Sequence, residues 1–393
     1  MDPVRILYLS DTGGQMGGAG AILIALVKRL DRSQFQPFAV LGSDGDMANA
    51  LRGLCVDVTV APLEPIVRSF RPATLARSMS RLIRGCRAVR AVCREKKIDI
   101  IHGNDNTVVF YAVLPAMMTG RKSVWHVHSA AKRLGCIGAF LVKHSTAIIF
   151  CSESVSAPFR RYPPKYTRKM VIAYESVNVP ALIEQSNRPS IREEYRIPPD
   201  VPLVGLVGRV TQIKGQDVFL EAAAAVSKLQ PRARFAIVGA PVAGSREALE
   251  ADAAFGDSLQ PLCEKLGIAD RVIFTGYRYD VPAVMKDLSV LAVPSRHEGL
   301  GIVALEAMIL GVPVVASSVD GLREVVQDGI NGLLVPVDDA AALGLAITRL
   351  LEDKDLARRL VDEARRSFPQ RFTADFQAKT ITDVYRVIMG ART

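Results

Sequence analysis

Short runs of apolar residues, rich in valine and isoleucine, alternate along the chain with segments of helical length. Runs that are apolar at nearly every position predict strands buried on both faces. Because these strands alternate with helices, the pattern predicts an α/β protein with parallel sheets covered on both sides. The predicted strands cover residues 4–9, 38–41, 56–60, 98–102, 123–128 and 147–151, and later residues 203–207, 234–238, 272–275, 289–293, 313–317 and 333–335.

An irregular, proline-containing stretch over residues 179–200 separates the two series of strands. A chain of 393 residues also exceeds the size at which a single hydrophobic core usually stops growing. We therefore interpret residues 1–178 and 201–370 as two Rossmann-like, doubly wound domains, joined by a linker at residues 179–200.

The segment with the most informative chemistry is PSRHEGLGIVALEAMILGVP, residues 294–313. Glu298 precedes a turn bracketed by Gly299 and Gly301, and Glu306 follows the turn inside a short apolar helix. The glycines allow a ligand to approach the backbone, and unpaired N–H groups at a helix start attract an anion. The two carboxylates would accept hydrogen bonds from sugar hydroxyls. This pattern fits an elongated ligand with an anionic centre and hydroxylated ends, such as a nucleotide sugar.

Two cations, Arg209 and Lys214, follow the predicted strand at residues 203–207. Ligands bind beyond the carboxyl ends of the strands in open α/β sheets, so both side chains are expected beside one ligand. An arginine forks onto two phosphate oxygens, and a lysine adds a mobile point charge. With the helix start, they would stabilise a departing nucleoside diphosphate without a metal. The alternative is that both are ordinary cations of a surface loop.

These motifs together resemble the retaining glycosyltransferases of family 4. The matching segments are GRVTQIKGQD, the segment from Glu298 to Glu306, and PVVASSVDGLREVVQDGINGLLV, with looser matches at GGQMGGAG and VWHVHS. The resemblance implies a GT-B fold, in which two Rossmann-like domains face each other across a cleft and residues 371–393 cross back onto the first domain. It also implies transfer of a sugar from a nucleoside diphosphate sugar, with UDP favoured, to a hydroxyl of a glycan, glycolipid or lipid-linked acceptor. Neither a cofactor nor a metal is implied.

The resemblance also assigns roles to individual residues of the second domain. Glu306 would bind the ribose hydroxyls and Glu298 would face the donor sugar, with Arg209 and Lys214 assisting catalysis. The nucleotide base would lie near Tyr277, although a plain turn explains that sequence equally well. The backbone expected to hold the diphosphate belongs to Gly299, Leu300, Gly301 and Ile302.

In the first domain the candidates are two glycines and two histidines. By resemblance, Gly17 and Gly18 open a helix near the diphosphate and the acceptor, although a turn without ligand contact would look the same. His126 and His128 alternate on one predicted strand, so they point to the same side, toward its carboxyl end. His128 is the closer match to the histidine that such enzymes carry there, and His126 is the second choice. Either would assist the acceptor hydroxyl or bind the donor sugar, unless both are structural.

The formal net charge of +10 favours an anionic partner. A helix predicted within residues 71–97 is strongly basic and amphipathic, so its arginine face is either solvated or directed at anionic lipid or an anionic acceptor. Aromatic residues do not interleave these arginines, which disfavours a nucleic-acid partner. The arginines are Arg77, Arg81, Arg84, Arg87, Arg90 and Arg94. The apolar stripe expected to pack on the first sheet is Leu75, Met79, Leu82, Cys86, Val89 and Cys93.

Cysteine usage and hydropathy favour a cytoplasmic protein, soluble or peripheral on the cytoplasmic face of a membrane. The 6 cysteines show no Cys-x-x-Cys pair and no zinc-like spacing, which indicates reduced thiols. The N-terminus enters a strand without a signal-peptide pattern, and no apolar run is long enough to span a bilayer. An Asp-x-Asp sequence occurs at residues 44–46, but no nucleotide-sugar pattern surrounds it, so we predict no metal site.

Two other functions remain compatible with the sequence. One is a sugar-nucleotide epimerase of the same two-domain architecture. The other is a non-catalytic sugar-nucleotide-binding protein associated with membranes.

Overall fold

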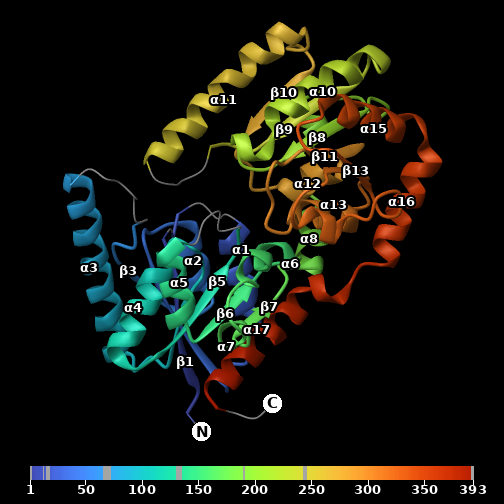
Figure 1. Cartoon of the computed structure of the whole chain (residues 1–393). Coiled ribbons are helices and arrows are strands. Elements are labelled where there is room, and N and C mark those ends of the chain that lie inside the picture. Colours follow the sequence, from blue (N-terminus) through green and yellow to red (C-terminus); the bar gives the residue numbers. More distant parts are fainter. Residues whose placement is uncertain are drawn as a thin grey trace. The chain divides into compact units, whose positions relative to one another are not determined.

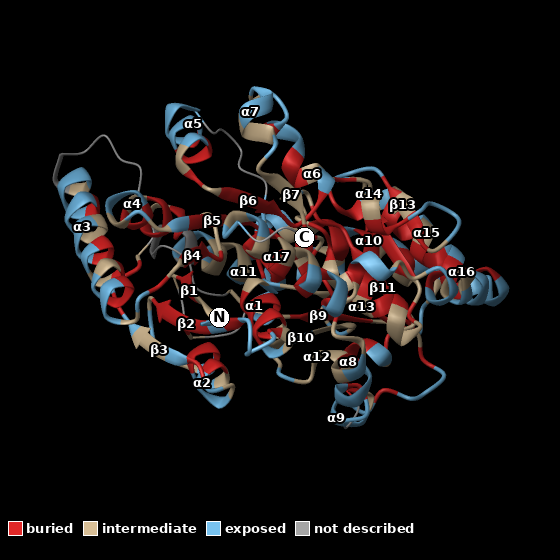
Figure 2. Cartoon of the chain, turned by 90° about the horizontal axis from the view of Figure 1, so that it is seen from below, coloured by how far each residue is buried: buried red, intermediate tan, exposed pale blue. Residues whose placement is uncertain are grey.

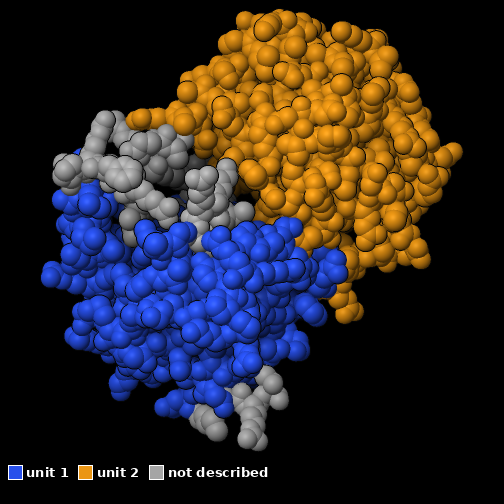
Figure 3. Space-filling view, viewed as in Figure 1, with its two compact units in different colours: residues 1–176, 371–393 blue, residues 177–370 orange. Residues whose placement is uncertain are grey.

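The computed structural model describes residues 2–11, 13–14, 18–64, 72–129, 135–188, 191–241 and 246–390, except the side chains of residues 72, 73 and 246–249. The chain forms two compact units (Figure 3). Unit 1 comprises Met1–Ser176 and Arg371–Thr393, and unit 2 comprises Val177–Gln370. The segment at residues 179–200, predicted to be a linker, lies within unit 2 and forms α8 (Val179–Gln185) and α9 (Ile191–Glu194).

The described residues of unit 1, several strands of which are labelled in Figure 1, form a seven-stranded parallel sheet. Its strand order is β3-β2-β1-β4-β5-β6-β7. The strand order reverses between β1 and β4, as in a doubly wound sheet. The strands predicted for this half are present with small shifts at their ends, and the short, partly buried β7 was missed. The strands are β1 (Val4–Ser10), β2 (Phe35–Leu41), β3 (Asp57–Val60), β4 (Ile100–Gly103), β5 (Lys122–Val127), β6 (Ala147–Phe150) and β7 (Met170–Ile172).

Helices cover both faces of this sheet. Successive side chains of β1 point to opposite faces, and both sets are buried. Ile6 and Tyr8 pack into a cluster with α1, α2 and the C-terminal helix α17, whereas Leu7 and Leu9 pack with α3 and α4. Buried residues accordingly follow the strands in Figure 2. The described helices of unit 1 are α1 (Gly18–Arg29), α2 (Asp46–Gly53), α3 (Pro72–Glu95), α4 (Val109–Thr119), α5 (Gly135–His144), α6 (Glu153–Ser156), η1 (Ala157–Phe159), α7 (Pro164–Thr167) and α17 (Ala374–Ile388).

The basic helix α3 departs from its prediction. Its C-terminal half packs as expected, since Cys86, Val89 and Cys93 are buried in the cluster shared with α4. In its N-terminal half, however, Leu75 is 53% exposed and Met79 is 49% exposed. The first turns of α3 contribute no residue to the buried cluster. The apolar stripe therefore packs along only part of its length.

The described residues of unit 2 form a six-stranded parallel sheet in the order β10-β9-β8-β11-β12-β13. Its core includes Phe219 and Phe235, which pack at a steep angle with 6.2 Å between ring centroids. The strands are β8 (Leu203–Val207), β9 (Arg234–Val238), β10 (Val272–Gly276), β11 (Val290–Val293), β12 (Val314–Ser317) and β13 (Leu333–Val335). The further helices are η2 (Gln212–Lys214), α10 (Gln216–Leu229), α11 (Arg246–Leu266), α12 (Val281–Lys286), α13 (Ile302–Leu310), α14 (Leu322–Val325), α15 (Ala340–Glu352) and α16 (Lys354–Arg366), followed by η3 (Gln370–Phe372).

Within the described part of the chain, no helix combines the length and the apolar character needed to cross a bilayer. The cysteines are free thiols, of which Cys86, Cys93, Cys151 and Cys263 are buried. Burial raises the pKa of Cys86, Cys93 and Cys263 to about 11, so these thiols stay protonated at neutral pH.

Candidate active site

The central strands of unit 2 place the predicted cations and carboxylates at one edge of the sheet. β8 lies between β9 and β11, and successive connections leave it in opposite directions. Such a reversal opens a crevice at the carboxyl ends of the strands, which is where open α/β sheets bind ligands. The loop after β8 carries Arg209 and Lys214, and the loop after β11 carries Glu298.

Lys214 and Glu298 form an ion pair that joins these two loops. The distance from Lys214 Nζ to Glu298 Oε1 is 2.5 Å, and the Glu298 side chain is only 9% exposed. Ser295 Oγ donates a second hydrogen bond to the same carboxylate oxygen at 2.9 Å. The structure therefore brings together two residues that are 84 positions apart in the sequence and holds the carboxylate in one orientation.

Gly215 allows this close approach of the two loops. Its φ of +71° lies in the left-handed region, and a Cβ atom there would lie 2.3 Å from the carbonyl oxygen of Pro294. Any side chain at this position would push the loop carrying Lys214 away from the loop carrying Glu298.

Arg296 is a further link between the loops, and sequence analysis missed it. Its backbone N–H donates to the carbonyl of Ile213 at 2.7 Å. Its guanidinium donates to Asp217 Oδ2 at 2.8 Å and to Asp338 Oδ1 at 2.6 Å. No local motif marks these partners, because Asp217 lies 79 residues before Arg296 and Asp338 lies 42 residues after it.

The turn before α13 requires glycine at two positions, Gly301 in the turn itself and Gly321 in a segment packed against it. Gly301 has φ +93° and precedes the helix without a side-chain cap. A Cβ atom on Gly321 would lie 2.3 Å from the Gly299 carbonyl oxygen and 2.5 Å from Leu300 Cα. The first turn of α13, which begins at Ile302, contains no acidic residue. Its N–H groups therefore keep the positive end of the helix dipole available for an anion.

Glu306 lies on α13, partly buried among apolar neighbours. It makes no hydrogen bond or ion pair with any residue that the structure describes. Burial raises the pKa of Glu306 to about 7, because no cation or donor compensates the loss of hydration. A carboxyl group in this condition is poised to accept hydrogen bonds from a ligand that supplies hydroxyl donors.

Arg209 is exposed at the start of the loop after β8. Its carbonyl accepts a hydrogen bond at 2.9 Å from Gln216 Nε2, which fixes the loop backbone to the start of α10. Among the described residues, none pairs with the Arg209 guanidinium. The backbone of this residue is thus held in place while its charge remains available.

Tyr277 lies in the loop after β10. Its ring meets that of Tyr279 edge to face, with 5.0 Å between the centroids. Both rings line a pocket of about 750 Å³ together with Arg278, which is paired with Asp280 at 2.7 Å and Glu194 at 2.8 Å. Contact between Tyr277 and a nucleotide base remains a prediction.

In unit 1, His128 follows β5 and pairs with a carboxylate. Its Nδ1 lies 2.8 Å from Glu175 Oε1, and the two side chains are 7% and 10% exposed. A carboxylate that accepts from Nδ1–H fixes the ring orientation and leaves Nε2 as the nitrogen for other chemistry. No motif in the sequence marks Glu175, which follows the short strand β7.

His126 has surroundings that differ from those expected of a ligand-binding side chain. It lies on the same face as His128, with 4.0 Å between ring centroids, but it is fully buried. Its Nδ1 is 3.3 Å from His102 Nε2, and His102 Nδ1 is 2.7 Å from the hydroxyl of Tyr385. Burial lowers the pKa of His102 to about 3 and that of His126 well below its usual value. Both rings are therefore neutral parts of the core that binds α17.

The remaining candidates of unit 1 are the two glycines and the Asp-x-Asp sequence. Gly17 lies outside the described residues, and Gly18 is the first residue of α1. Asp44 pairs with Arg52 at 2.7 Å, and Asp46 is the first residue of α2. Over the residues that the structure describes, no group of three potential ligands is arranged to hold a metal ion.

Two doubly wound units, one with cations, a helix start and a desolvated carboxyl group at its strand reversal, define the class of two-domain α/β proteins with Rossmann-like units. Comparison with known families narrows this class. Residues 16–179 match the family described as Glycosyltransferase Family 4, and residues 187–367 match Glycosyl transferases group 1. The chain belongs to the family 4 glycosyltransferases and has the two Rossmann-like domains of the GT-B fold.

Individual relatives agree with this assignment. The chain is 37% identical over 210 residues to 2-deoxystreptamine N-acetyl-D-glucosaminyltransferase of Streptomyces fradiae, covering 52% of this chain and 47% of that protein. It is 34% identical over 208 residues to D-inositol 3-phosphate glycosyltransferase of Xylanimonas cellulosilytica, with the same coverages of 52% and 47%. The chain thus spans about half the length of the curated relatives it matches. The crystal structure of Anabaena HepE with UDP and glucose superposes with a TM-score of 0.79 at 22% identity, covering 98% of this chain and 100% of that one.

Proposed function

We propose that this protein is a retaining glycosyltransferase that moves a sugar from a nucleoside diphosphate sugar, with UDP favoured, to a hydroxyl of a glycan, glycolipid or lipid-linked acceptor. The observation that carries the proposal is the Lys214–Glu298 ion pair at the strand reversal of unit 2. Support for the donor comes from HepE, whose structure contains UDP and glucose. Relatives that are named as glycosyltransferases support the reaction class.

Donor binding would use Glu306, the start of α13 and Arg209. The ribose hydroxyls would donate to the carboxylate of Glu306, which has no partner among the described residues. The diphosphate would meet the start of α13 and the charge of Arg209. These groups would act most strongly on the charge that develops as the sugar departs, which is the condition for lowering the barrier. The start of α13 and Arg209 would supply the positive charge that a metal ion would otherwise provide.

Lys214 would change partners when the donor binds. In the structure its ammonium group is paired with Glu298. A diphosphate carries more negative charge than one carboxylate, so it would draw the flexible lysine toward itself. Glu298, still held by Ser295, would then accept hydrogen bonds from the donor sugar.

His128 would act on the acceptor hydroxyl or on the donor sugar. With Nδ1 held by Glu175, the other ring nitrogen is the one that would exchange a proton or a hydrogen bond with substrate. Glu175 is then a positioning residue that acts through His128.

The donor is best identified by thermal-shift measurements with UDP-, GDP-, ADP- and dTDP-sugars, because a ligand of the folded state raises its stability. Product analysis with the bound donor then tests the reaction. A glycoside with the donor's anomeric configuration supports the proposal, and the opposite configuration contradicts retention. An epimerised free sugar would indicate an epimerase, and binding without turnover on any acceptor would indicate a sensor.

We also propose that α3 attaches the protein peripherally to the anionic cytoplasmic face of a membrane. Leu75, Met79 and Ile83 are 53%, 49% and 44% exposed, and their spacing of four residues places them on one helix face. Arginines 84 and 87 are also exposed, and each cation near an anionic surface adds about 1 kcal/mol. Flotation with anionic liposomes should show salt-sensitive binding that is lost when the three apolar residues are replaced by serine. Equal flotation of this variant would contradict the proposal.

A further inference from the structure

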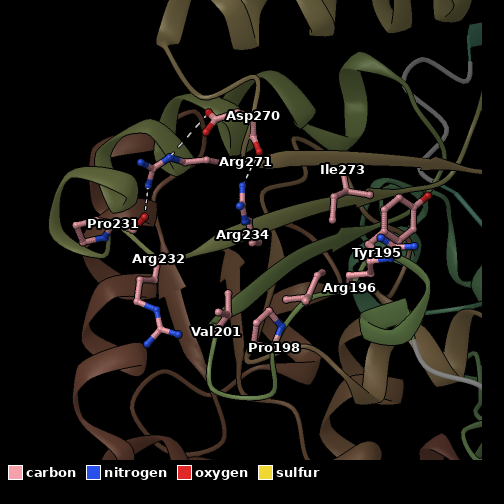
Figure 4. Close-up of a pocket in the computed structure, with 11 residues that line it drawn as sticks. Tyr195, Arg196, Pro198, Val201, Pro231, Arg232, Arg234, Asp270, Arg271 and Ile273 are labelled. Atoms are coloured by element: carbon pink, nitrogen blue, oxygen red, sulfur yellow. Dashed lines mark hydrogen bonds and ion pairs between the residues drawn. The ribbon is translucent and has the colours of Figure 1, made fainter.

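A pocket of about 520 Å³ lies at the opposite edge of the unit 2 sheet from Lys214 and Glu298 (Figure 4). It is formed where β8, β9 and β10 begin, and by the segment that follows α9. A five-residue strand such as β8 spans about 16 Å, so the pocket is separate from the donor site. Its volume is within the range of small-molecule sites, which is about 300–1,000 Å³.

The charged residues that line this pocket are mostly arginines. They are Arg196, Arg232, Arg234 and Arg271, with Asp270 as the carboxylate among the lining residues. Arg232 is neutralised by Asp200 at 2.5 Å. Asp270 is 77% exposed and its Oδ1 lies 4.0 Å from Arg271 Nε, so it offsets part of the remaining charge. The lining therefore carries a net positive charge, which would concentrate anions in the pocket.

Two of these arginines are held in place by backbone carbonyl groups. Arg234 Nη1 donates to the backbone carbonyl of Asp270 at 2.5 Å, and Arg271 Nη1 donates to the backbone carbonyl of Pro231. A neutral carbonyl orients a guanidinium group but does not cancel its charge. Each group retains further N–H donors, which suit the oxygen atoms of a phosphate.

Arg196 contributes a third guanidinium group from the segment after α9. Its φ of +51° is uncommon for a residue with a side chain, and it is exposed. Its side chain makes no hydrogen bond or ion pair with a described residue. Figure 4 shows Arg196 beside Tyr195, with Arg234 between these two residues and Arg271.

The rest of the lining is largely apolar. Ile197 and Val201 are each 7% exposed, and Ile273 and the ring of Tyr195 complete this part of the pocket. Ile197 and Val201 are already shielded from water, so Ile273 and Tyr195, which are not buried, are the groups that the body of a ligand would cover. The lining thus combines phosphate-binding donors with a surface for a planar or apolar body.

We propose that this pocket binds a small phosphate monoester with a planar or apolar body, at a site distinct from the donor site. The phosphate lies against Arg234 and Arg271, with Arg196 as the additional cation. The body lies against Tyr195 and Ile273. Binding at this edge of the sheet does not require Lys214, Glu298 or Glu306.

Titration calorimetry with phenyl phosphate tests this site, because the probe has a phosphate and a planar ring but no ribose for Glu306. The full-length Arg209→Ala/Lys214→Ala variant serves as the background, so that binding at the donor site is suppressed. Phenyl phosphate is expected to bind this background more tightly than inorganic phosphate does. Arg234→Gln/Arg271→Gln should weaken binding by about tenfold or more, the loss expected from one or two charge-assisted hydrogen bonds.

Arg358→Gln/Arg359→Gln on the exposed face of α16 removes the same charge elsewhere and should leave phenyl phosphate affinity unchanged. Arg196→Gln is a second test that does not depend on folding, because no described contact is lost; it should weaken binding several-fold. Equal weakening by the α16 control, or no effect of either pocket variant, would overturn the proposal. So would the absence of phenyl phosphate binding. Loss of donor binding in the background variant bears only on the donor site.

Discussion

Glu306 is the residue at which stability and ligand binding are expected to conflict. Its pKa is raised from an ordinary 4.5 to about 7 because the carboxyl group is desolvated without a partner. Between these two pH values the unfolded chain has released the proton while the folded protein retains it. The folded state then binds more protons, so the free energy of unfolding falls as the pH rises. Above about pH 7 the destabilisation is complete.

The magnitude follows from the pKa difference. At about 1.4 kcal/mol per pH unit, the rise from 4.5 to about 7 corresponds to at most about 3.5 kcal/mol, and the part of Glu306 open to solvent reduces this to about 1–3 kcal/mol. Glu306→Gln has no charge to bury, so it should gain this much stability relative to wild type on going from pH 5 to pH 8. For a unit of this size the gain corresponds to roughly 2–12 °C in Tm.

Calorimetric unfolding at pH 5 and pH 8, with and without UDP, measures both effects. Wild type should be stabilised by UDP more strongly at pH 8 than at pH 5, because ribose hydroxyls bind the ionised carboxylate. In Glu306→Gln, UDP should raise Tm by a smaller amount. The pH dependence of that rise should come only from the ionisation of UDP itself. If the Tm difference between the two proteins is the same at pH 5 and pH 8, Glu306 has an ordinary pKa and the reasoning fails.

Three further outcomes follow from the site. Lys214→Ala should lower turnover by about 10²-fold or more, since it removes a preorganised charge; a near-normal rate would exclude Lys214 from the reaction. Glu175→Gln should lower kcat, by at most the ~10²- to 10⁴-fold that a general base contributes, without changing KM for the donor, and Glu175→Asp should restore part of it; a change in Tm alone would make Glu175 purely structural. Gly321→Ala should destabilise unit 2 by about 1–3 kcal/mol and weaken UDP binding, because its Cβ would displace the Gly299 carbonyl; unchanged UDP affinity would show that this turn does not bind the diphosphate.

Much of the fold could be predicted because buried parallel strands leave a local signature. Leu203–Val207 and Arg234–Val238 have the predicted bounds, since all residues of these strands except Val207 and Arg234 are buried. β7 was missed because its apolar run of three residues is short and only partly buried. The exposure of Leu75 and Met79 in the N-terminal half of α3 was also unpredictable. A periodic apolar stripe does not reveal how far the neighbouring element extends along the helix.

The site was predictable only as far as chemistry is local in sequence. The segment from Glu298 to Glu306 and the pair Arg209 and Lys214 carry their own signals. The link between the two loops carries no such signal. Arg296 contacts Asp217 and Asp338, which are distant from it in the sequence and come close only in the folded chain. In unit 1 the alternation of His126 and His128 correctly gave their shared face but not their different burial, which depends on His102 and the distant Tyr385.

The return of the last helix to unit 1 has a consequence for biosynthesis. Ile381, Val384 and Tyr385 of α17 fill the same hydrophobic core as Ile6 and Tyr8, although nearly the whole chain separates them. Unit 2 is contiguous, so it can complete its core on the ribosome while the earlier unit still lacks a helix. The first unit to be translated is therefore the last to be finished, and a stop codon that removes only the final twenty or so residues would expose its interior.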